Sequence, residues 1–373
     1  MTLSLIDHHV HGVVTGDLDR ADFELLMTEA SGPPAPGTTM FDSQLGYTMR
    51  RWCAPVLGLE PSASPEDYLR RRAELGTAEA NKRLLTAAGV GHWLVDTGYQ
   101  SDQVTTPEQM VAASGAPASH VVRLEAVAEK VARAGTTAAD WAGAFADELG
   151  AVSAAVGAVG YKSIVAYRFG FDFDPVRPAS AEVAAAASRL IRVFETDPAA
   201  RLDDPVLLRH LIWSAIDIGK PLQFHVGFGD TDVRMHRSDP SLLTDFMIAT
   251  EPTGTPIMLL HCYPHHRVAG YLAHVFSHVY MDLGAALNYV GARSAAVLAE
   301  ALELTPFGKM LYSSDAFGLP ELHYLGAIGF RRDIARVTDQ FVADGAWSAA
   351  DAERVAELIG SANATRVYRL GQS

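Results

Sequence analysis

Several side chains that can bind a metal ion stand where strand-like stretches of this sequence end. His9 and His11 follow the first such stretch, and His225, His261 and Asp315 end three later ones. Alternate side chains of a strand point the same way, so the imidazoles of His9 and His11 project together. Nitrogen donors with one carboxylate and an open position form a catalytic zinc or related divalent site. A lone histidine is more often a core or surface residue, but the set at matching strand ends favours a metal centre.

Strand-like and helical stretches alternate along the chain, and this alternation predicts how the donors meet. The expected strands cover residues 3–12, 92–98, 119–125, 160–167, 220–227, 256–261, 278–283 and 309–315. Eight short apolar strands separated by helices indicate an α/β fold, a (β/α)8 TIM barrel with a closed parallel sheet. All strands of such a barrel open their carboxyl ends on one face. The competing open, doubly wound sheet usually has a glycine-rich first turn, and none follows the first strand.

A long segment, about 13–90, separates the first two expected strands. It contains a turn-rich stretch over residues 31–37, where proline and glycine exclude helix and strand pairing, and then a helix over residues 65–88. Long segments on such loops tend to form a lid or a pocket wall. We therefore expect one barrel domain over residues 1–373, with a long helical insertion that forms part of the pocket.

The composition limits the partners of this chain. Acidic residues outnumber basic ones, 44 to 30, and the formal net charge is −14, which argues against a nucleic-acid partner. The only cysteines, Cys53 and Cys262, fit a reducing cytoplasm. Neither a leader-like stretch nor an apolar run of about 18 residues is visible. These features predict a cytoplasmic protein with a small-molecule substrate and no membrane partner, and they leave a homo-oligomer open.

Four stretches carry a family resemblance. They are Asp7–His11, Phe224–Asp230, Leu260–Pro264 and Tyr312–Ala316. Together with a lysine on the fourth expected strand, they resemble the amidohydrolase superfamily. More narrowly they are similar to the amidohydrolase-2 branch, which includes the domain fused to glutamine-synthetase-like proteins in fungi and plants. The resemblance implies a metal-dependent barrel enzyme that hydrolyses an amide-type C–N bond.

The same resemblance implies a role for each donor. His9, His11 and Asp315 would hold one ion, and His225 and His261 would hold or face a second; zinc is the metal expected. Lys162 stands where dinuclear members carry a carbamylated lysine that bridges two ions. That modification needs a neutral amine, which burial near metal ions favours. The alternative is an ordinary lysine paired with an acid, since mononuclear relatives lack the bridge.

The implied chemistry assigns two catalytic residues and a substrate shell. A divalent ion lowers the pKa of water from about 15.7 towards about 7. Asp315 would take the proton and pass it to a leaving amine, while His261 would polarise the substrate carbonyl. Arg168, with its neighbour Tyr167, is the candidate for binding a substrate carboxylate, and Asp230 is the candidate for a substrate amine. Arg51 and Trp52 are candidates for the pocket wall. Surface or core roles stay open for all five residues.

Three functions are compatible with these residues. The first is hydrolysis of a small amide, such as a γ-glutamyl or other amino-acid amide. The second is decarboxylation or hydration at a site with one metal ion, as in other members of the branch. The third is a catalytically silent, metal-binding regulatory protein, which the complete set of donors argues against. Two ions together with a modified Lys162 would favour hydrolysis.

Overall fold

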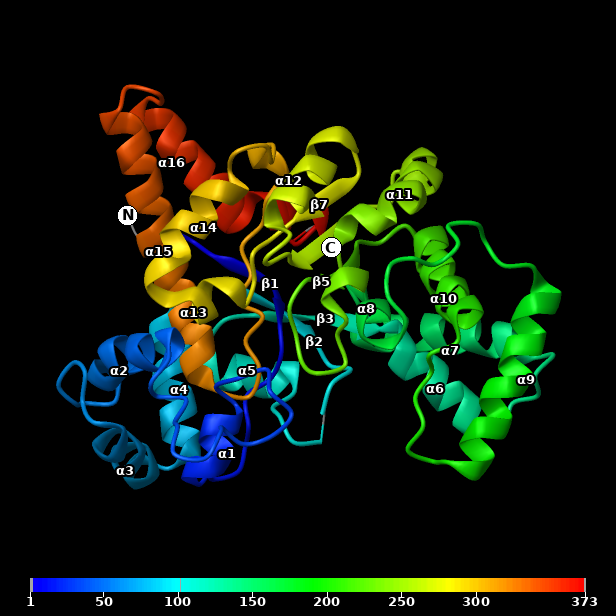
Figure 1. Ribbon diagram of the computed structural model, residues 1–373, viewed down its shortest axis with the longest axis horizontal. Coiled ribbons are helices and arrows are strands. Elements are labelled where there is room, and N and C mark those ends of the chain that lie inside the picture. Colours follow the sequence, from blue (N-terminus) through cyan, green and yellow to red (C-terminus); the bar gives the residue numbers. More distant parts are fainter. Residues whose placement is uncertain (1–2, 101, 372–373) are drawn as a thin grey trace.

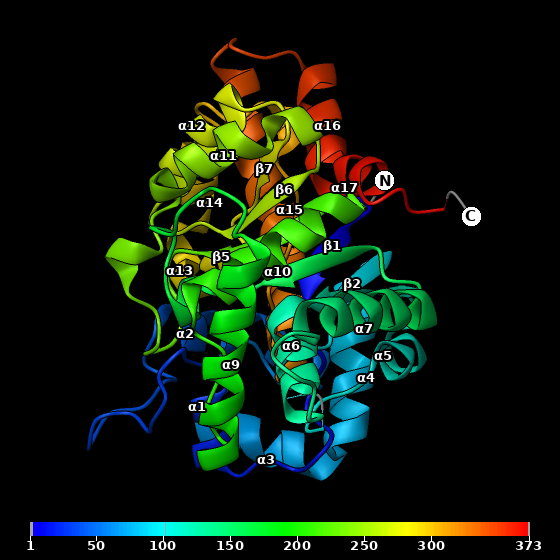
Figure 2. The same ribbon diagram turned by 90° about the vertical axis from the view of Figure 1, so that its right-hand side faces the viewer.

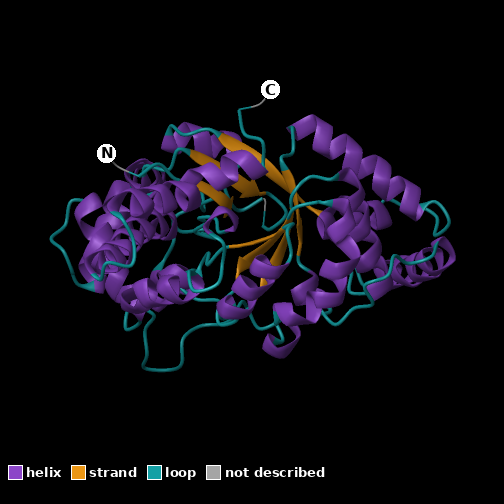
Figure 3. Cartoon of the chain, turned by 90° about the horizontal axis from the view of Figure 1, so that it is seen from above, coloured by secondary structure: helices purple, strands orange, loops and turns teal. Residues whose placement is uncertain are grey.

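The computed structural model describes residues 3–100 and 102–371, and its centre is a curled parallel sheet. The sheet has seven strands that pair in chain order from β1 to β7. Seen from above, helices surround the sheet (Figure 3). The strands are β1 (Ile6–Val10), β2 (His92–Asp96), β3 (Ala118–Arg123), β4 (Gly160–Ser163), β5 (Leu222–Val226), β6 (Ile257–His261) and β7 (Val279–Met281). The α/β class and the parallel sheet are confirmed, and the arrangement is TIM-barrel-like.

The eighth expected strand, residues 309–315, is an irregular extended segment between β7 and β1. A single bridge pairs Met310 with Met281 of β7. On the other side, the amide of Asp315 donates to the carbonyl of His9 at 3.1 Å. Two other amides of the segment do not donate to strand carbonyls: that of Tyr312 donates to the carbonyl of Ile359, and that of Ser314 to the side-chain carboxylate of Asp7. Because these groups are already bonded, the segment closes the gap in the sheet without forming a regular strand.

Helices follow most strands on the outside of the sheet. They gather on two sides of it, with α6, α7, α9 and α10 on one side and α1 to α4 on the other (Figure 1). In order after β2, the helices are α5 (Pro107–Ser114), α6 (Leu124–Arg133), α7 (Trp141–Val156), α8 (Val165–Arg168), α9 (Ser180–Thr196), α10 (Pro205–Ile218), α11 (Thr244–Thr250), α12 (His266–Val275), α13 (Ala286–Val290), α14 (Ser294–Ala301), α15 (Pro320–Ala343), α16 (Ala349–Glu357) and α17 (Asn363–Val367). Within the described residues, none of the helices combines the length and apolar character needed to cross a membrane.

The segment between β1 and β2 contains four helices: α1 (Arg20–Leu25), α2 (Gln44–Val56), α3 (Pro65–Leu75) and α4 (Thr77–Ala88). The helix expected over residues 65–88 is interrupted at Gly76, whose φ of 76° no helix can accommodate. A buried cluster joins α3 to α15, because Tyr68 Oη and Arg72 Nε donate to Glu321 Oε1 at 3.0 and 2.9 Å.

A separate apolar core fills the inside of the curled sheet. It combines side chains of the strands with side chains of α17, which lies beside β1 (Figure 2). From the strands and the eighth segment come Ile6, Leu94, Val121, Met258, Leu260 and Leu311, and from the end of the chain Ala364, Val367 and Tyr368. The C-terminal segment therefore packs into the barrel interior beneath the predicted metal donors.

Candidate metal centre

The end of β1 presents two imidazoles to the inside of the sheet. The pairing of β1 with β2 shifts register between Asp7 and Val10, an irregularity typical of a β-bulge. The ring centroids of His9 and His11 lie 5.2 Å apart. Their Nε2 atoms are 3.2 and 3.9 Å from Asp315 Oδ1. The structure thus brings these three predicted donors together.

His261, the last residue of β6, approaches the same carboxylate from the other side. Its Nδ1 is 3.1 Å from Asp315 Oδ2. Both residues have a left-handed backbone, with φ of 67° at His261 and 50° at Asp315, which is sparsely populated by residues other than glycine and is found at functional sites. Gly284 makes room for the ring, since a Cβ there would lie 2.4 Å from His261 Nδ1.

Two buried nitrogen atoms at this point fit a metal ion. His9 Nε2 and His261 Nδ1 are both buried and have no hydrogen-bond partner within residues 3–100 and 102–371. His9, His261 and Asp315 each contribute one possible ligand atom, and these three atoms lie within 4.8 Å of one another. Leaving buried polar atoms unsatisfied costs free energy, which a cation between them would remove. Imidazole and carboxylate donors are those that a divalent ion such as zinc takes.

Asp96, at the end of β2, supports the site but was missed in the sequence. It forms a second group of closely spaced donor atoms with His9 and His11. Its carboxylate is already engaged, because Arg123 Nη2 and Nε donate to Oδ2 at 2.6 and 3.1 Å. Its backbone carbonyl accepts from His11 Nδ1 at 3.1 Å, which leaves His11 Nε2 to face the centre. Its position near the end of the expected strand 92–98, like that of the predicted donors, could have identified it as a site residue.

Burial keeps the donor histidines neutral, as metal ligands must be. It lowers the pKa of His9, His225 and His261 well below the usual range, and the nearby charge of Lys162 adds to this effect. Burial also lowers the pKa of His11 to about 4. Lys162 is buried on β4 and is paired in register with Gln223, which contacts His9, so β4 directs this predicted ligand to the side of the sheet that carries the donors.

The two groups of opposite charge at the centre also have displaced pKa values. Burial lowers the pKa of Lys162 to about 8, although Asp315 opposes the shift. Burial raises the pKa of Asp315 well above its usual range, while Lys162 opposes and Glu29 adds to the increase. An acid and a base in one buried cluster with pKa values moved towards neutrality are typical of functional sites.

His225 lies beside this group rather than against Asp315. Its Nε2 donates to the carbonyl of Phe228 at 3.1 Å. Its ring centroid is 4.7 Å from that of His261 and 4.3 Å from that of Tyr167, which the short helix α8 carries. Tyr167 is therefore the predicted substrate residue that the structure places next to the donors.

The other predicted substrate residues are more distant from the donors. Arg168 turns towards α6, with Nη2 3.5 Å from Glu129 Oε1. Arg51 and Trp52 stack on the exposed side of α2, with the guanidinium 5.3 Å from the ring centroid. Asp230 is partly buried, and burial raises its pKa. The structure thus does not bring Arg168, Arg51 or Trp52 to the metal donors.

A cavity of about 370 Å³ lies at the carboxyl ends of β5, β6 and β7. Phe228, Tyr263 and Tyr289 line one side of it, and the segment between β1 and β2 contributes Met27, Thr28, Glu29, Met40, Ser43 and Leu45. Tyr289 Oη donates to Glu29 Oε1 at 3.1 Å. The charge of Glu29 also adds to the raised pKa of the buried Asp315 carboxyl group. Glu29 had no signal in the sequence, because it lies in an irregular segment.

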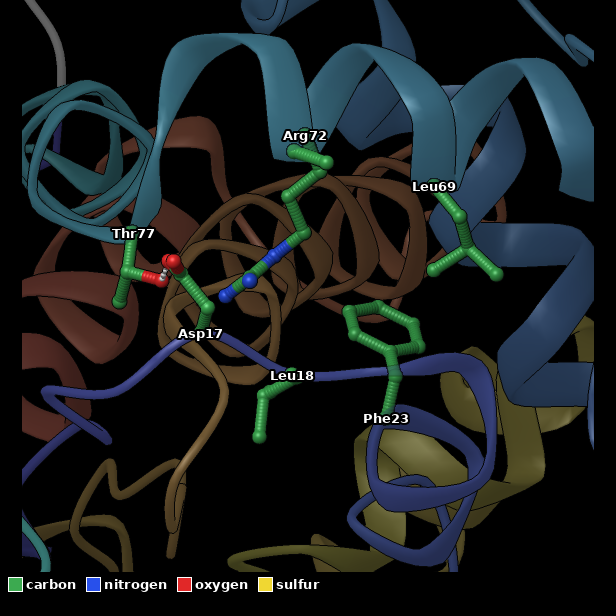
Figure 4. Close-up of a pocket in the computed structure, with 7 residues that line it drawn as sticks. Asp17, Leu18, Phe23, Leu69, Arg72 and Thr77 are labelled. Atoms are coloured by element: carbon green, nitrogen blue, oxygen red, sulfur yellow. Dashed lines mark hydrogen bonds between the residues drawn. The ribbon is translucent and has the colours of Figure 1, made fainter.

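A smaller hollow of about 100 Å³ lies between α1 and α3, away from the donors. Its lining includes Asp17, Phe23 and Arg72 (Figure 4). Thr77 Oγ1 donates to Asp17 Oδ1 across its edge at 2.8 Å. Among the described residues, none of the metal donors lines this hollow or the larger cavity, and the larger cavity differs in lying at the carboxyl ends of strands that carry donors.

Comparison with known proteins adds a family to this geometry. Protein fluG of Emericella nidulans is 32% identical over 230 residues, which cover 57% of this chain and 26% of that protein. The chain therefore spans about a quarter of the length of this curated relative. A Lactobacillus casei protein assigned as a metal-dependent hydrolase has 28% identity and a TM-score of 0.85, over 99% of this chain and 96% of that one.

More distant structures share the fold. Uronate isomerase of Thermotoga maritima has 12% identity and a TM-score of 0.65, over 98% of this chain and 94% of its own. The corresponding Bacillus halodurans enzyme has 14% identity and a TM-score of 0.63, over 99% and 94%. A family model described as Amidohydrolase matches residues 57–370. The chain belongs to the amidohydrolase family.

Proposed function

We propose that this protein is a metal-dependent hydrolase of an amide-type C–N bond in a small molecule. The observation that carries the proposal is the pair of buried nitrogens, His9 Nε2 and His261 Nδ1, that face the two oxygens of Asp315 without a hydrogen-bond partner in the described chain. Membership of the amidohydrolase family and the similarity to an assigned metal-dependent hydrolase support it. Zinc is the ion that we expect at these donors.

The side chains have distinct tasks in this reaction. A bound divalent ion lowers the pKa of water to about 7 and polarises a carbonyl oxygen. Asp315 lies within reach of both sides of the centre, so its carboxylate can accept a proton from water and deliver it to the leaving amine. His261 faces Asp315 and therefore acts as a ligand in this arrangement. Tyr167 lies beside His225, and we assign its hydroxyl group as the hydrogen-bond donor to the substrate carbonyl.

The cavity suggests the class of substrate. Its volume suits a small organic molecule, since ligand pockets usually measure about 300–1,000 Å³. Glu29 lines it, and among the described residues only burial, the hydrogen bond from Tyr289 and the charge of Asp230 act on the pKa of this carboxyl group. Asp230 lies close enough to raise the pKa of Glu29 further. A carboxylate such as Glu29, whose pKa is raised by burial and on which no cation acts in the described residues, favours a substrate that carries an ammonium group, such as a γ-glutamyl or other amino-acid amide.

Metal analysis combined with an amide screen tests the proposal. We expect the purified protein to hold a divalent metal and to release amine from γ-glutamyl or N-acyl amides. Asp315→Asn with metal retained should lower kcat by about 10²–10⁴-fold, because the proton acceptor is lost. Asp217→Asn, which makes the same change at an exposed ion pair on α10, serves as the control. Full activity in metal-loaded Asp315→Asn contradicts the proposal, and carbon dioxide release without amine release identifies a decarboxylase instead.

A further inference from the structure

A buried glutamine fixes the orientation of His9 beneath the candidate metal centre. Gln223 of β5 is fully buried, and its Oε1 lies 2.8 Å from His9 Nδ1. Its Nε2 lies 2.8 Å from the carbonyl oxygen of His8 and 2.9 Å from Tyr368 Oη. Because a carbonyl oxygen only accepts, the amide nitrogen of Gln223 must face His8. Oε1 therefore faces His9, and the proton of that ring must be on Nδ1.

The same reasoning extends through four more groups and ends at another donor. Tyr368 Oη accepts from Gln223, so its own proton can go to His8 Nδ1 at 3.0 Å. His8 Nε2 then carries a proton and donates to Asp282 Oδ2 at 2.7 Å. Asp282 Oδ1 accepts the backbone amide of His261 at 2.7 Å. One continuous run of hydrogen bonds therefore links six residues, and we call it the support chain. In order, its members are His9, Gln223, Tyr368, His8, Asp282 and His261.

Every member of the support chain is inside the barrel. His8, Gln223 and Asp282 have no exposed surface, and Tyr368 is 4% exposed. Hydrogen bonds in such surroundings are stronger than in water, and a group that loses its partner there is costly. The carbonyl of His8 fixes the orientation of Gln223, and Gln223 in turn fixes the proton of His9 on Nδ1.

We infer that Gln223 and Tyr368 are positioning residues that hold His9 in the tautomer required of a metal ligand. The inference rests on the proposed metal centre. A neutral imidazole has one donor and one acceptor nitrogen, and a proton on Nε2 would point at the ion. With Nδ1 protonated by the support chain, the Nε2 lone pair faces Asp315. The other end of the chain holds the amide of His261, whose φ is 67°.

The tautomer can be measured without any metal. In the metal-free protein with ¹⁵N-labelled histidine, NMR should show His9 protonated at Nδ1 and His8 at Nε2. Gln223→Met removes the acceptor for His9, so we expect the form with Nε2 protonated to appear. The opposite tautomer of His9 in the wild-type protein contradicts the inference whatever the protein catalyses.

Zinc affinity provides the second readout, measured by competition with a chelator. Tyr368→Phe removes one hydroxyl and keeps the ring, and Gln223→Met breaks the chain at its centre. Partners of metal-binding histidines typically contribute about 10–100-fold in affinity, so both variants should bind zinc less tightly by factors in this range. Tyr161→Phe is the matched control, because Tyr161 is 1% exposed and its Oη is hydrogen-bonded to Ser153 at 3.0 Å, outside the support chain.

These outcomes separate the inference from the proposed function. If Tyr368→Phe weakens zinc binding no more than Tyr161→Phe does, the chain has only a structural role. If zinc affinity follows the support chain but no amide is hydrolysed, the inference stands and the proposed reaction is wrong. If the wild-type protein binds no divalent metal, the proposed centre and the role of these positioning residues both fail, although the NMR result still reports the tautomer.

Discussion

Removing one partner of the buried ion pair between Asp96 and Arg123 should destabilise the protein far more than removing one partner of an exposed pair of the same type. Arg123 donates twice to Asp96 Oδ2, at 2.6 and 3.1 Å, and the two side chains are 9% and 0% exposed. Arg177 and Asp217 form two hydrogen bonds of 2.8 and 2.6 Å, but these side chains are 48% and 57% exposed. The distances are similar, so burial is the variable that differs.

The expected effects on the free energy of unfolding follow from this difference. Removing one partner of a buried pair leaves an uncompensated charge and costs about 3–5 kcal/mol, whereas an exposed pair contributes about 0–1 kcal/mol. We therefore expect Arg123→Met to cost about 3–5 kcal/mol and Arg177→Met to cost less than about 1 kcal/mol. Asp96 should also lose its fixed position, and with it the carbonyl that accepts from His11.

Urea unfolding of the metal-free protein measures both changes at neutral pH. Burial by itself would raise the pKa of Asp96, but Arg123 outweighs it and the net shift is downward. A depressed carboxyl pKa stabilises the fold above the unfolded-state pKa, and this contribution disappears as the pH falls through the folded-state value. The difference between wild type and Arg123→Met should therefore shrink in acid. Equal costs for Arg123→Met and Arg177→Met would refute the reasoning, as would a variant series in which Asp96→Asn and Arg123→Met are additive.

Three further predictions concern the candidate site. Glu29→Gln should lower kcat/KM for a γ-glutamyl amide by about 10–100-fold but spare the glutaryl analogue, which lacks the ammonium group, and Glu353→Gln on the exposed side of α16 should change neither. Gly284→Ala places a Cβ against a donor nitrogen at 2.4 Å and should abolish tight zinc binding, whereas Gly345→Ala, with a similar positive φ and nothing within 4 Å, should lose only about 1–2 kcal/mol of stability. A carbamate forms on a neutral amine, so its occupancy at Lys162 should rise with pH through about 8 in bicarbonate, and unmodified lysine in crystal density at alkaline pH would exclude the bridge.

The convergence of the donors could be predicted because it depends on strand order and direction alone. Parallel strands end on one face, so His9 and His261 were expected to meet although 252 residues separate them, and the structure places both against Asp315. Lys162 was expected there because the resemblance to the amidohydrolase superfamily places a lysine on the fourth strand. What the sequence could not supply was which side chains orient these groups, since Gln223 contacts His9 across 214 positions without any local pattern.

The irregular elements were harder to anticipate for a similar reason. The eighth segment reads as an apolar strand, but the amide of Ser314 donates to Asp7, a partner 307 positions away. The pair of Arg51 and Trp52 reads equally well as pocket wall or helix surface, and only the packing of α2 decides between them. Gly76 interrupts an otherwise helical pattern because of its backbone conformation, which residue type permits but does not require.

The support chain also orders events during synthesis. His8 and Tyr368 are in contact although 360 positions separate them. At about 5–20 residues per second, roughly 20–70 s pass between translation of the first and of the second. Throughout that interval His8 has no hydroxyl partner for Nδ1, and Gln223, once it has been translated, still has no hydroxyl partner. A nascent chain therefore has the donors of β1 before it has the complete support chain, so the hydrogen bonds that orient them are complete only after Tyr368 has packed into the barrel.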